Sequence, residues 1–369
     1  MVNAIIRDGQ YLIHFGDCFE TAILYASTES FLRFVNSRGV CPKVVVIGLR
    51  PACGSGKETV MRAFRIVLFA LCVIALIIPA AAQAPGQPAT TPSPRPQMPP
   101  LAPTGPGTGP YAAIAEVDPA LAGFTIFRPK NLDALQGVKL PILSWANGGC
   151  ANSPSGFEPF LAEVASHGFL VIALGTTPPQ PGQTASKQLT QAIDWALAQN
   201  AQADSKYKGK LDTSKIAAGG MSCGGLQALE VAPDPRLTTV MVCNSGVITP
   251  TNAPAAANGF KMPVSVTKDI LQQLRTPMLY LIGGPKDIAY NNAMDDFSRI
   301  DKVPVFMLNH DVGHGGTYRE ENGGEFGKVA VAWLKWQLKG DAAAGKMFVG
   351  TDCGFCTNPV WKIQVKNYK

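Results

Sequence analysis

Histidine and charged residues are scarce in this sequence of 369 residues. It contains four histidines, and charged residues make up 16% of the chain against 46% for hydrophobic residues. Beyond residue 84 there are 24 basic and 21 acidic residues, without a stripe of Lys and Arg interleaved with aromatics. This composition can supply a large packed core, so it excludes a chain that is disordered throughout and argues against nucleic acid as a partner.

The sequence contains a targeting segment at residues 61–84, whose apolar run is short. Two arginines precede the run 66–78, and a small-residue A-x-A sequence ends the segment. This order is typical of a secretory signal peptide, and the run is short for a membrane span. We therefore expect a secreted or periplasmic protein with no stable membrane insertion after signal cleavage, the alternative being an uncleaved anchor.

The targeting segment begins at Met61, so we infer a natural start there and interpret residues 1–60 as a mis-called upstream extension. A genuine extension that hides the signal is the alternative. The extension contains KVVVIGLRPACGSGKET, in which Pro51 and Glu58 replace the first Gly and the final Ser or Thr of a phosphate-binding loop. Because a carboxylate there would repel phosphate, we reject nucleotide binding.

Five cysteines follow residue 84, an odd number that allows at most two disulfides and one free thiol in an exported protein. They are Cys150, Cys223, Cys243, Cys353 and Cys356. The CGFC sequence favours a local disulfide, with a free pair as the alternative, because no second cysteine pair or nearby histidine completes a zinc set. A pairing of Cys223 with Cys243 stays open. The motifs imply no metal and no organic cofactor.

Residues 85–110, rich in Pro, Gly and Thr, predict an extended linker before a folded domain at 111–340 and a C-terminal extension at 341–369. Apolar strand-like runs then alternate with helical patterns, which predicts an α/β fold with a mainly parallel eight-stranded sheet and helices on both faces. The strand-like runs are 112–117, 124–129, 141–145, 169–175, 215–220, 238–246, 277–284 and 303–309, and the helical patterns are 157–166, 186–199, 223–231, 268–274, 290–300 and 326–338. The strands before the first helix suggest an antiparallel start.

The sequence GMSCG, residues 220–224, fits the G-x-S-x-G motif of a nucleophile elbow between a predicted strand and a predicted helix. A sharp turn brings the flanking backbone so close that side chains at Gly220 and Gly224 would clash. Such a turn would place the Ser222 hydroxyl at a helix N-terminus, where partial positive charge favours a developing anion. A purely structural turn is the alternative.

A serine hydroxyl needs a base and an orienting carboxylate. We predict His314 as the base, because it lies in a glycine-flanked loop after the last strand. We interpret His310 as a supporting or buried histidine and His167 as a surface residue at a helix end. Asp287 follows the preceding strand, so the chain order Ser, Asp, His matches that of α/β-hydrolases. Asp311 is the weaker alternative for the acid.

The oxyanion needs two N–H donors. The Cys223 amide directly follows the nucleophile, and the loop SWANGGC offers a second donor, with Gly149 the first choice and Gly148 the next. Glycines that serve only a tight turn are the alternative interpretation. Met221 and Ile288 flank the proposed nucleophile and acid, and we expect them to line the substrate pocket unless they are core residues.

These motifs, together with NGG, GGPKD and VGHGG, resemble those of secreted bacterial α/β-hydrolases of the dienelactone hydrolase, cutinase and polyester hydrolase group, over about residues 111–338. The resemblance implies the α/β-hydrolase fold, a triad of Ser222, His314 and Asp287, and hydrolysis of a small-molecule or polymeric carboxylic ester through an acyl-enzyme. An acyltransferase with the same triad and a non-catalytic binding protein on this scaffold are the alternatives. Oligomeric state, acyl chain length and a lid at 250–263 stay open.

Overall fold

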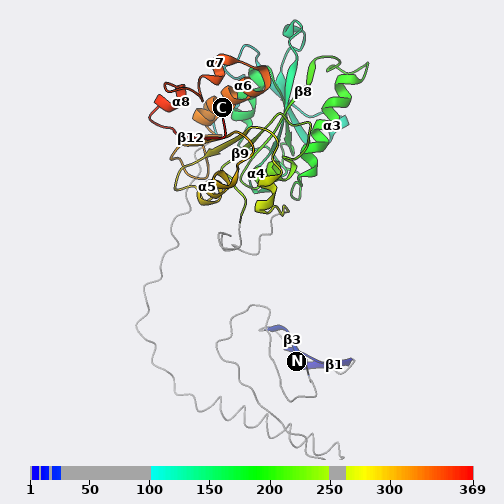
Figure 1. Ribbon diagram of the computed structural model, residues 1–369. Helices are drawn as coiled ribbons and strands as arrows, with labels where there is room; N and C mark the ends of the chain where they lie inside the picture. The colour runs from blue at the N-terminus through cyan, green and yellow to red at the C-terminus, as the bar shows by residue number, and fades with distance from the viewer. Residues whose placement is uncertain (1, 8–9, 16–18, 26–100, 249–262, 369) are drawn as a thin grey trace, which may run out of the picture. The chain divides into compact units, whose positions relative to one another are not determined.

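The computed structural model of the protein describes residues 2–7, 10–15, 19–25, 101–248 and 263–368. The expected signal peptide, most of the linker and nearly all of segment 250–263 therefore lie outside the described residues. The chain divides into two compact units, Met1–Pro92 and Ser93–Lys369 (Figure 1). In the first unit, β1 (Val2–Arg7), β2 (Gln10–Phe15) and β3 (Phe19–Tyr25) form an antiparallel sheet.

The second unit is built on a nine-stranded sheet with the order β12-β11-β10-β9-β8-β6-β7-β5-β4. The pairs β4–β5, β5–β7 and β11–β12 are antiparallel, and the other neighbouring pairs are parallel. The strands are β4 (Ala113–Glu116), β5 (Phe124–Pro129), β6 (Leu140–Ala146), β7 (Leu170–Leu174), β8 (Leu211–Met221), β9 (Thr239–Cys243), β10 (Met278–Ile282), β11 (Val305–Asn309) and β12 (Lys362–Lys366).

Helices cover both faces of this sheet and enclose two hydrophobic clusters. One cluster contains side chains of α3 (Lys187–Ala201), α4 (Cys223–Val231) and α5 (Tyr290–Arg299). The other contains side chains of α2 (Glu158–Ser166) and α6 (Gly324–Lys339). Every residue of β6, β7, β9, β10 and β11 is buried, which explains the nearly continuous apolar runs in their sequences.

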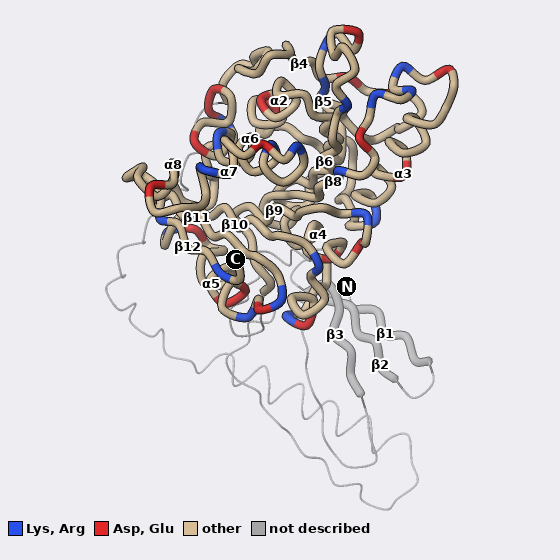
Figure 2. The backbone as a smooth tube through the Cα atoms, turned by 45° about the horizontal axis from the view of Figure 1, so that its top comes forward, with Lys and Arg blue, Asp and Glu red and all other residues tan. Residues whose placement is uncertain are grey.

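Most charged residues lie on the loops and helices around the sheet, and a few, such as Asp287 and Asp296, are buried. Figure 2 shows Lys and Arg interspersed with Asp and Glu over the loops and helices, and the strands β6, β7, β9, β10 and β11 contain no charged residue. Among the described residues, no helix combines the length and the apolar character needed to cross a bilayer.

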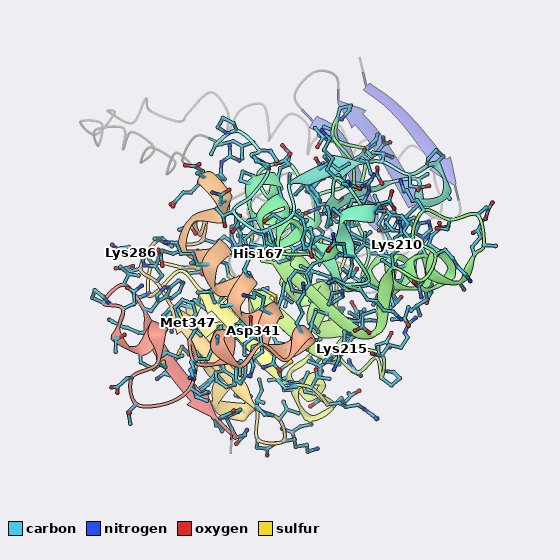
Figure 3. The ribbon with its side chains drawn as sticks, turned by 90° about the horizontal axis from the view of Figure 1, so that it is seen from above. His167, Lys210, Lys215, Lys286, Asp341 and Met347 are labelled. Atoms are coloured by element: carbon cyan, nitrogen blue, oxygen red, sulfur yellow. A yellow bond between two sulfur atoms is a disulfide. The ribbon has the colours of Figure 1, made fainter. Side chains whose placement is uncertain are left out.

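The expected mainly parallel sheet with helices on both faces is confirmed, but it has a ninth strand. The segment 341–369 supplies α7 (Ala342–Gly345), α8 (Gly354–Thr357) and β12, which pairs with β11. Figure 3 marks Asp341 and Met347 at its start, beside α6. The C-terminal extension is thus part of the same packed unit. The helix expected at 268–274 is a 3-10 helix, η5 (Lys268–Gln272).

The described end of the linker, residues 101–110, packs against α2. The Thr108 backbone N–H and hydroxyl both donate to the Glu163 carboxylate, at 2.7 and 2.5 Å. His167 lies 3.0 Å from the same carboxylate, and the Gly109 N–H donates to the Ser166 hydroxyl. The chain thus joins the folded unit several residues before 111.

Candidate active site

Ser222 lies between β8 and α4 in a strained turn. Its φ of 55° and ψ of −117° lie in a region that residues other than glycine rarely adopt. A Cβ atom added to Gly220 would lie 2.3 Å from the Gly224 carbonyl oxygen, and one added to Gly224 would lie 2.1 Å from that of Ala146. Both glycines are therefore required by the close backbone approach that the sequence predicted.

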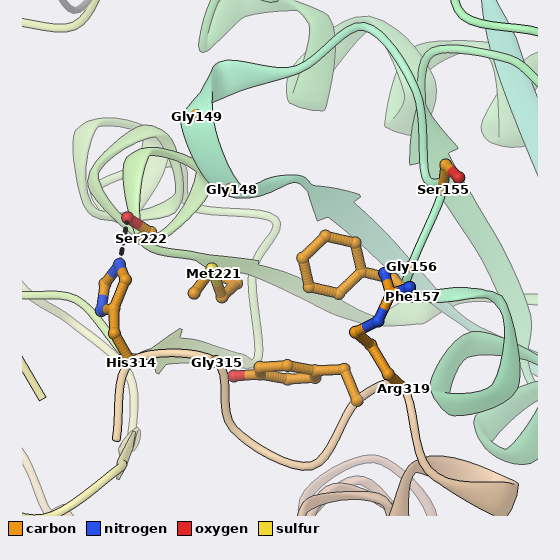
Figure 4. A pocket seen from close by; sticks show the side chains of 11 residues that line it. Gly148, Gly149, Ser155, Gly156, Phe157, Met221, Ser222, His314, Gly315 and Arg319 are labelled. Atoms are coloured by element: carbon orange, nitrogen blue, oxygen red, sulfur yellow. Dashed lines mark hydrogen bonds between the residues drawn. The ribbon is translucent and has the colours of Figure 1, made fainter. Parts of the chain in front are cut away.

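Two hydrogen bonds connect Ser222 to a carboxylate through His314. The Ser222 Oγ lies 3.0 Å from His314 Nε2 (Figure 4). His314 Nδ1 lies 2.6 Å from Asp287 Oδ1. Because an ionised carboxylate only accepts hydrogen bonds, Nδ1 carries the proton and Nε2 is left to accept the serine proton. Asp287 follows β10 and His314 follows β11, so neighbouring strand ends bring the two side chains to the end of β8.

The Asp287 side chain is fully buried and accepts three hydrogen bonds besides that of His314. Asn244 Nδ2 donates to it at 2.7 Å, the Gly283 N–H at 3.0 Å and the Ala289 N–H at 2.9 Å. Burial alone would raise the pKa of Asp287, but the hydrogen bond from His314 and those from the backbone outweigh it, so this pKa lies below its usual value. Asp287 is thus held as a carboxylate.

Asn244 and Tyr318 support this carboxylate and were missed in the sequence. Asn244 directly follows β9 and has a φ of 43°. The buried Tyr318 hydroxyl donates to Asn244 Oδ1 at 2.5 Å, which turns the amide nitrogen toward Asp287. A polar residue at the carboxyl end of an apolar strand was the signal available for Asn244. Tyr318 gave no comparable signal.

The predicted oxyanion donors lie on two loops joined by a disulfide. Gly149 has a φ of 64° and lies in η3 (Gly148–Cys150), directly after β6. Within the described residues, neither the Gly149 N–H nor the Cys223 N–H donates to a protein acceptor. Cys150 is bonded to Cys223, so the pairing of Cys223 with Cys243 is wrong, and Cys243 is a buried free thiol. Cys353 and Cys356 form the expected local disulfide.

Two cavities adjoin Ser222 and His314. The larger, about 270 Å³, is lined by aromatic, sulfur and glycine residues and by one arginine: Gly148, Gly149, Ser155, Gly156, Phe157, Met221, Gly315, Tyr318 and Arg319. Figure 4 shows Met221, and farther away Phe157, to one side of the Ser222–His314 pair. The smaller, about 50 Å³, includes Ile288, whose side chain is 69% exposed. Met221 and Ile288 therefore border different cavities.

The other predicted candidates lie apart from this chain of hydrogen bonds. The His310 ring contacts the Trp361 ring in a tilted arrangement, with centroids 5.2 Å apart. The Asp311 side chain is 58% exposed and lies 3.6 Å from the Lys286 ammonium. Neither side chain is hydrogen-bonded to Ser222, His314 or Asp287.

Residues 100–352 match the protein family described as PET hydrolase-like. The chain belongs to this family. It is therefore an ester hydrolase with the α/β-hydrolase fold, which confirms the resemblance seen in the motifs. No curated protein compared with it gives a match. The two disulfides among the described residues are compatible with a secreted protein.

Proposed function

We propose that the protein is an exported serine esterase that cleaves carboxylic esters through an acyl-enzyme intermediate. Ser222 attacks the ester carbonyl carbon while His314 Nε2 accepts its proton. His314 then protonates the departing alcohol, and Asp287 stabilises the imidazolium. Water then attacks the acyl-enzyme while His314 accepts its proton, and His314 returns this proton to the Ser222 oxygen as the acid is released. The signal peptide at 61–84 would direct this enzyme to the secreted or periplasmic space.

The Gly149 and Cys223 N–H groups would bind the oxyanion of each tetrahedral intermediate. Their lack of protein acceptors supports this role, because an N–H already engaged by a carbonyl could not turn to a developing charge. Met221 would contact one side of the ester in the larger cavity, and Ile288 the other side in the smaller one. The two cavities on either side of Ser222 provide separate space for an acyl and an alcohol group.

The observation that carries the proposal is the pair of hydrogen bonds from Ser222 to His314 and from His314 to Asp287, at 3.0 and 2.6 Å. A nucleophile, a base and a buried anion lie in line, so the base is held in the tautomer that accepts the serine proton. A scaffold that only binds a ligand would have no need of this alignment.

Hydrolysis of a short-chain p-nitrophenyl ester by the purified chain and by its Ser222→Ala variant tests the proposal. We expect kcat to fall by about 10⁴-fold or more, because the nucleophile is removed while the fold is kept. Ser214→Ala, a replacement of an exposed serine on the same strand β8, is the matched control and should keep the parent rate. Comparable turnover by a folded Ser222→Ala variant would contradict the proposal.

Product analysis in the presence of competing alcohols and amines separates hydrolysis from acyl transfer. The proposed esterase releases the free acid as its main product. An acyltransferase would instead give mainly the new ester or amide, because the acceptor would reach the acyl-enzyme before water. Absence of both products from a folded chain would favour a binding protein.

A further inference from the structure

The Cys150–Cys223 disulfide lies at the proposed oxyanion hole. Cys150 directly follows Gly149, and Cys223 carries the other proposed donor on its own backbone nitrogen. We propose that Cys150 and Cys223 are positioning residues, whose disulfide holds the Gly149 and Cys223 N–H groups at the spacing that the oxyanion requires. The inference rests on the proposed esterase function and concerns the geometry of that same site.

Gly149 itself makes few contacts that would fix its position. A Cβ atom added to Gly149 would meet no atom within 4 Å, so this residue borders open space. Its carbonyl accepts one hydrogen bond, from the exposed Gln183 side chain at a long 3.3 Å. The direction of the Gly149 N–H therefore depends on the residues that flank it.

Cys150 is the flanking residue that anchors the loop. It is fully buried, and its φ of 50° continues the left-handed conformation of Gly149. Two consecutive left-handed residues, one of them not glycine, require support from their surroundings. The Thr184 N–H donates to the Cys150 carbonyl at 2.9 Å, and the disulfide fixes the Cys150 side chain to α4.

The other end of the disulfide is the first residue of α4, directly after Ser222. Cys223 is buried, and α4 is packed against β6, β8 and β9. One covalent bond thus joins the loop that carries Gly149 to the turn that carries both the nucleophile and the second donor. Oxyanion stabilisation depends on donors that already point at the developing charge. A loosened loop therefore weakens the binding of the transition state more than the binding of the substrate.

A Cys150→Ser/Cys223→Ser variant tests the inference, with Cys353→Ser/Cys356→Ser as the matched control. The control removes a disulfide whose cysteines line neither cavity beside Ser222. Each protein is assayed for kcat and KM with a p-nitrophenyl ester, and for inhibition by phenylboronic acid, which forms a tetrahedral adduct with a serine hydroxyl. All assays are run at a temperature where circular dichroism shows every variant folded.

We expect kcat of the Cys150→Ser/Cys223→Ser variant to fall by at least about tenfold, but by less than the 10²- to 10³-fold that removal of a whole donor costs. KM should change by less than about twofold. Its inhibition constant for phenylboronic acid should rise by the factor by which kcat/KM falls, because both report tetrahedral binding. The control should keep the parent kcat and inhibition constant. If the disulfide were purely structural, its removal would lower the unfolding temperature without changing the inhibition constant.

Unchanged kcat and inhibition constant in a folded Cys150→Ser/Cys223→Ser variant would overturn the inference and leave the esterase proposal intact. A parent protein that neither hydrolyses the ester nor binds the boronic acid would overturn both. If the double variant does not fold, Cys150→Ala replaces it, because the Cys223 thiol then still fills its own buried site. The same readouts apply to that variant.

Discussion

Replacing Asp287 with Asn tests how the buried carboxylate controls His314. Asp287 Oδ2 accepts from Asn244 Nδ2 and the Gly283 N–H, and Oδ1 accepts from the Ala289 N–H and His314 Nδ1. An asparagine has the same shape but carries an NH₂ group in place of one oxygen. Whichever way the amide is turned, its NH₂ group faces donors.

His314 is the one partner of Asp287 that can change from donor to acceptor. With the NH₂ group turned toward it, the ring moves its proton to Nε2 and accepts at Nδ1. Nε2 then no longer accepts the proton of Ser222. We expect kcat to fall by about 10⁴-fold, or about 5 kcal/mol of transition-state stabilisation, the cost of the wrong tautomer in a serine hydrolase. The Ala289 N–H loses its acceptor in this arrangement, which costs about 1–3 kcal/mol of stability.

Steady-state hydrolysis of a p-nitrophenyl ester at neutral pH measures the loss, and circular dichroism confirms that the variant is folded. Asp311→Asn is the matched control, because this exposed carboxylate lies in the same region of the sequence but outside the triad. It should keep kcat within about twofold, as surface substitutions usually do. An Asp287→Asn variant that keeps a tenth of the parent kcat, or an equal loss in Asp311→Asn, would refute the reasoning.

Two further predictions concern stability. The pKa of Glu116 lies at about 2, because hydrogen bonds from Arg128 and Lys206 outweigh the effect of burial, which alone would raise it. At a pH above the unfolded pKa of Glu, this lowered pKa stabilises the fold by about 3 kcal/mol, and the stabilisation is lost as the pH falls toward 2. Urea unfolding should show Glu116→Gln less stable than the parent at neutral pH and equally stable near pH 2. A difference in stability that persists in acid would contradict this origin. Gly224→Ala should lower the unfolding temperature by more than Gly315→Ala, because its Cβ atom would lie 2.1 Å from a backbone oxygen whereas that of Gly315 meets no atom within 4 Å; equal unfolding temperatures would count against the tight turn.

Local patterns were sufficient for most of the fold. Buried parallel strands are continuous apolar runs, so β6, β7, β9, β10 and β11 stand out from the helices between them. The ninth strand escaped because β12, with the sequence KIQVK, is a largely exposed edge strand without an apolar run. Its pairing with β11 depends on the path of the chain after α6, which the local pattern does not encode.

The candidate site also has residues that the local pattern predicts and residues that it does not. Ser222, Asp287 and His314 each follow a recognisable strand. Because the carboxyl ends of parallel strands lie at the same edge of a sheet, the sequence predicts that the three residues meet there. The roles of Asn244 and Tyr318 depend on the directions of side chains in three dimensions. The Cys150–Cys223 disulfide joins residues 73 positions apart, and its two loops are neighbours only because β6 and β8 are adjacent in the sheet.

The most direct test of the central claim is to treat the purified protein with a fluorophosphonate probe and locate the label by mass spectrometry while ester turnover is followed. The account predicts one label per chain, on Ser222, with turnover lost in proportion to labelling. Label on another residue with full loss of turnover, or turnover that persists when Ser222 is fully labelled, would contradict it.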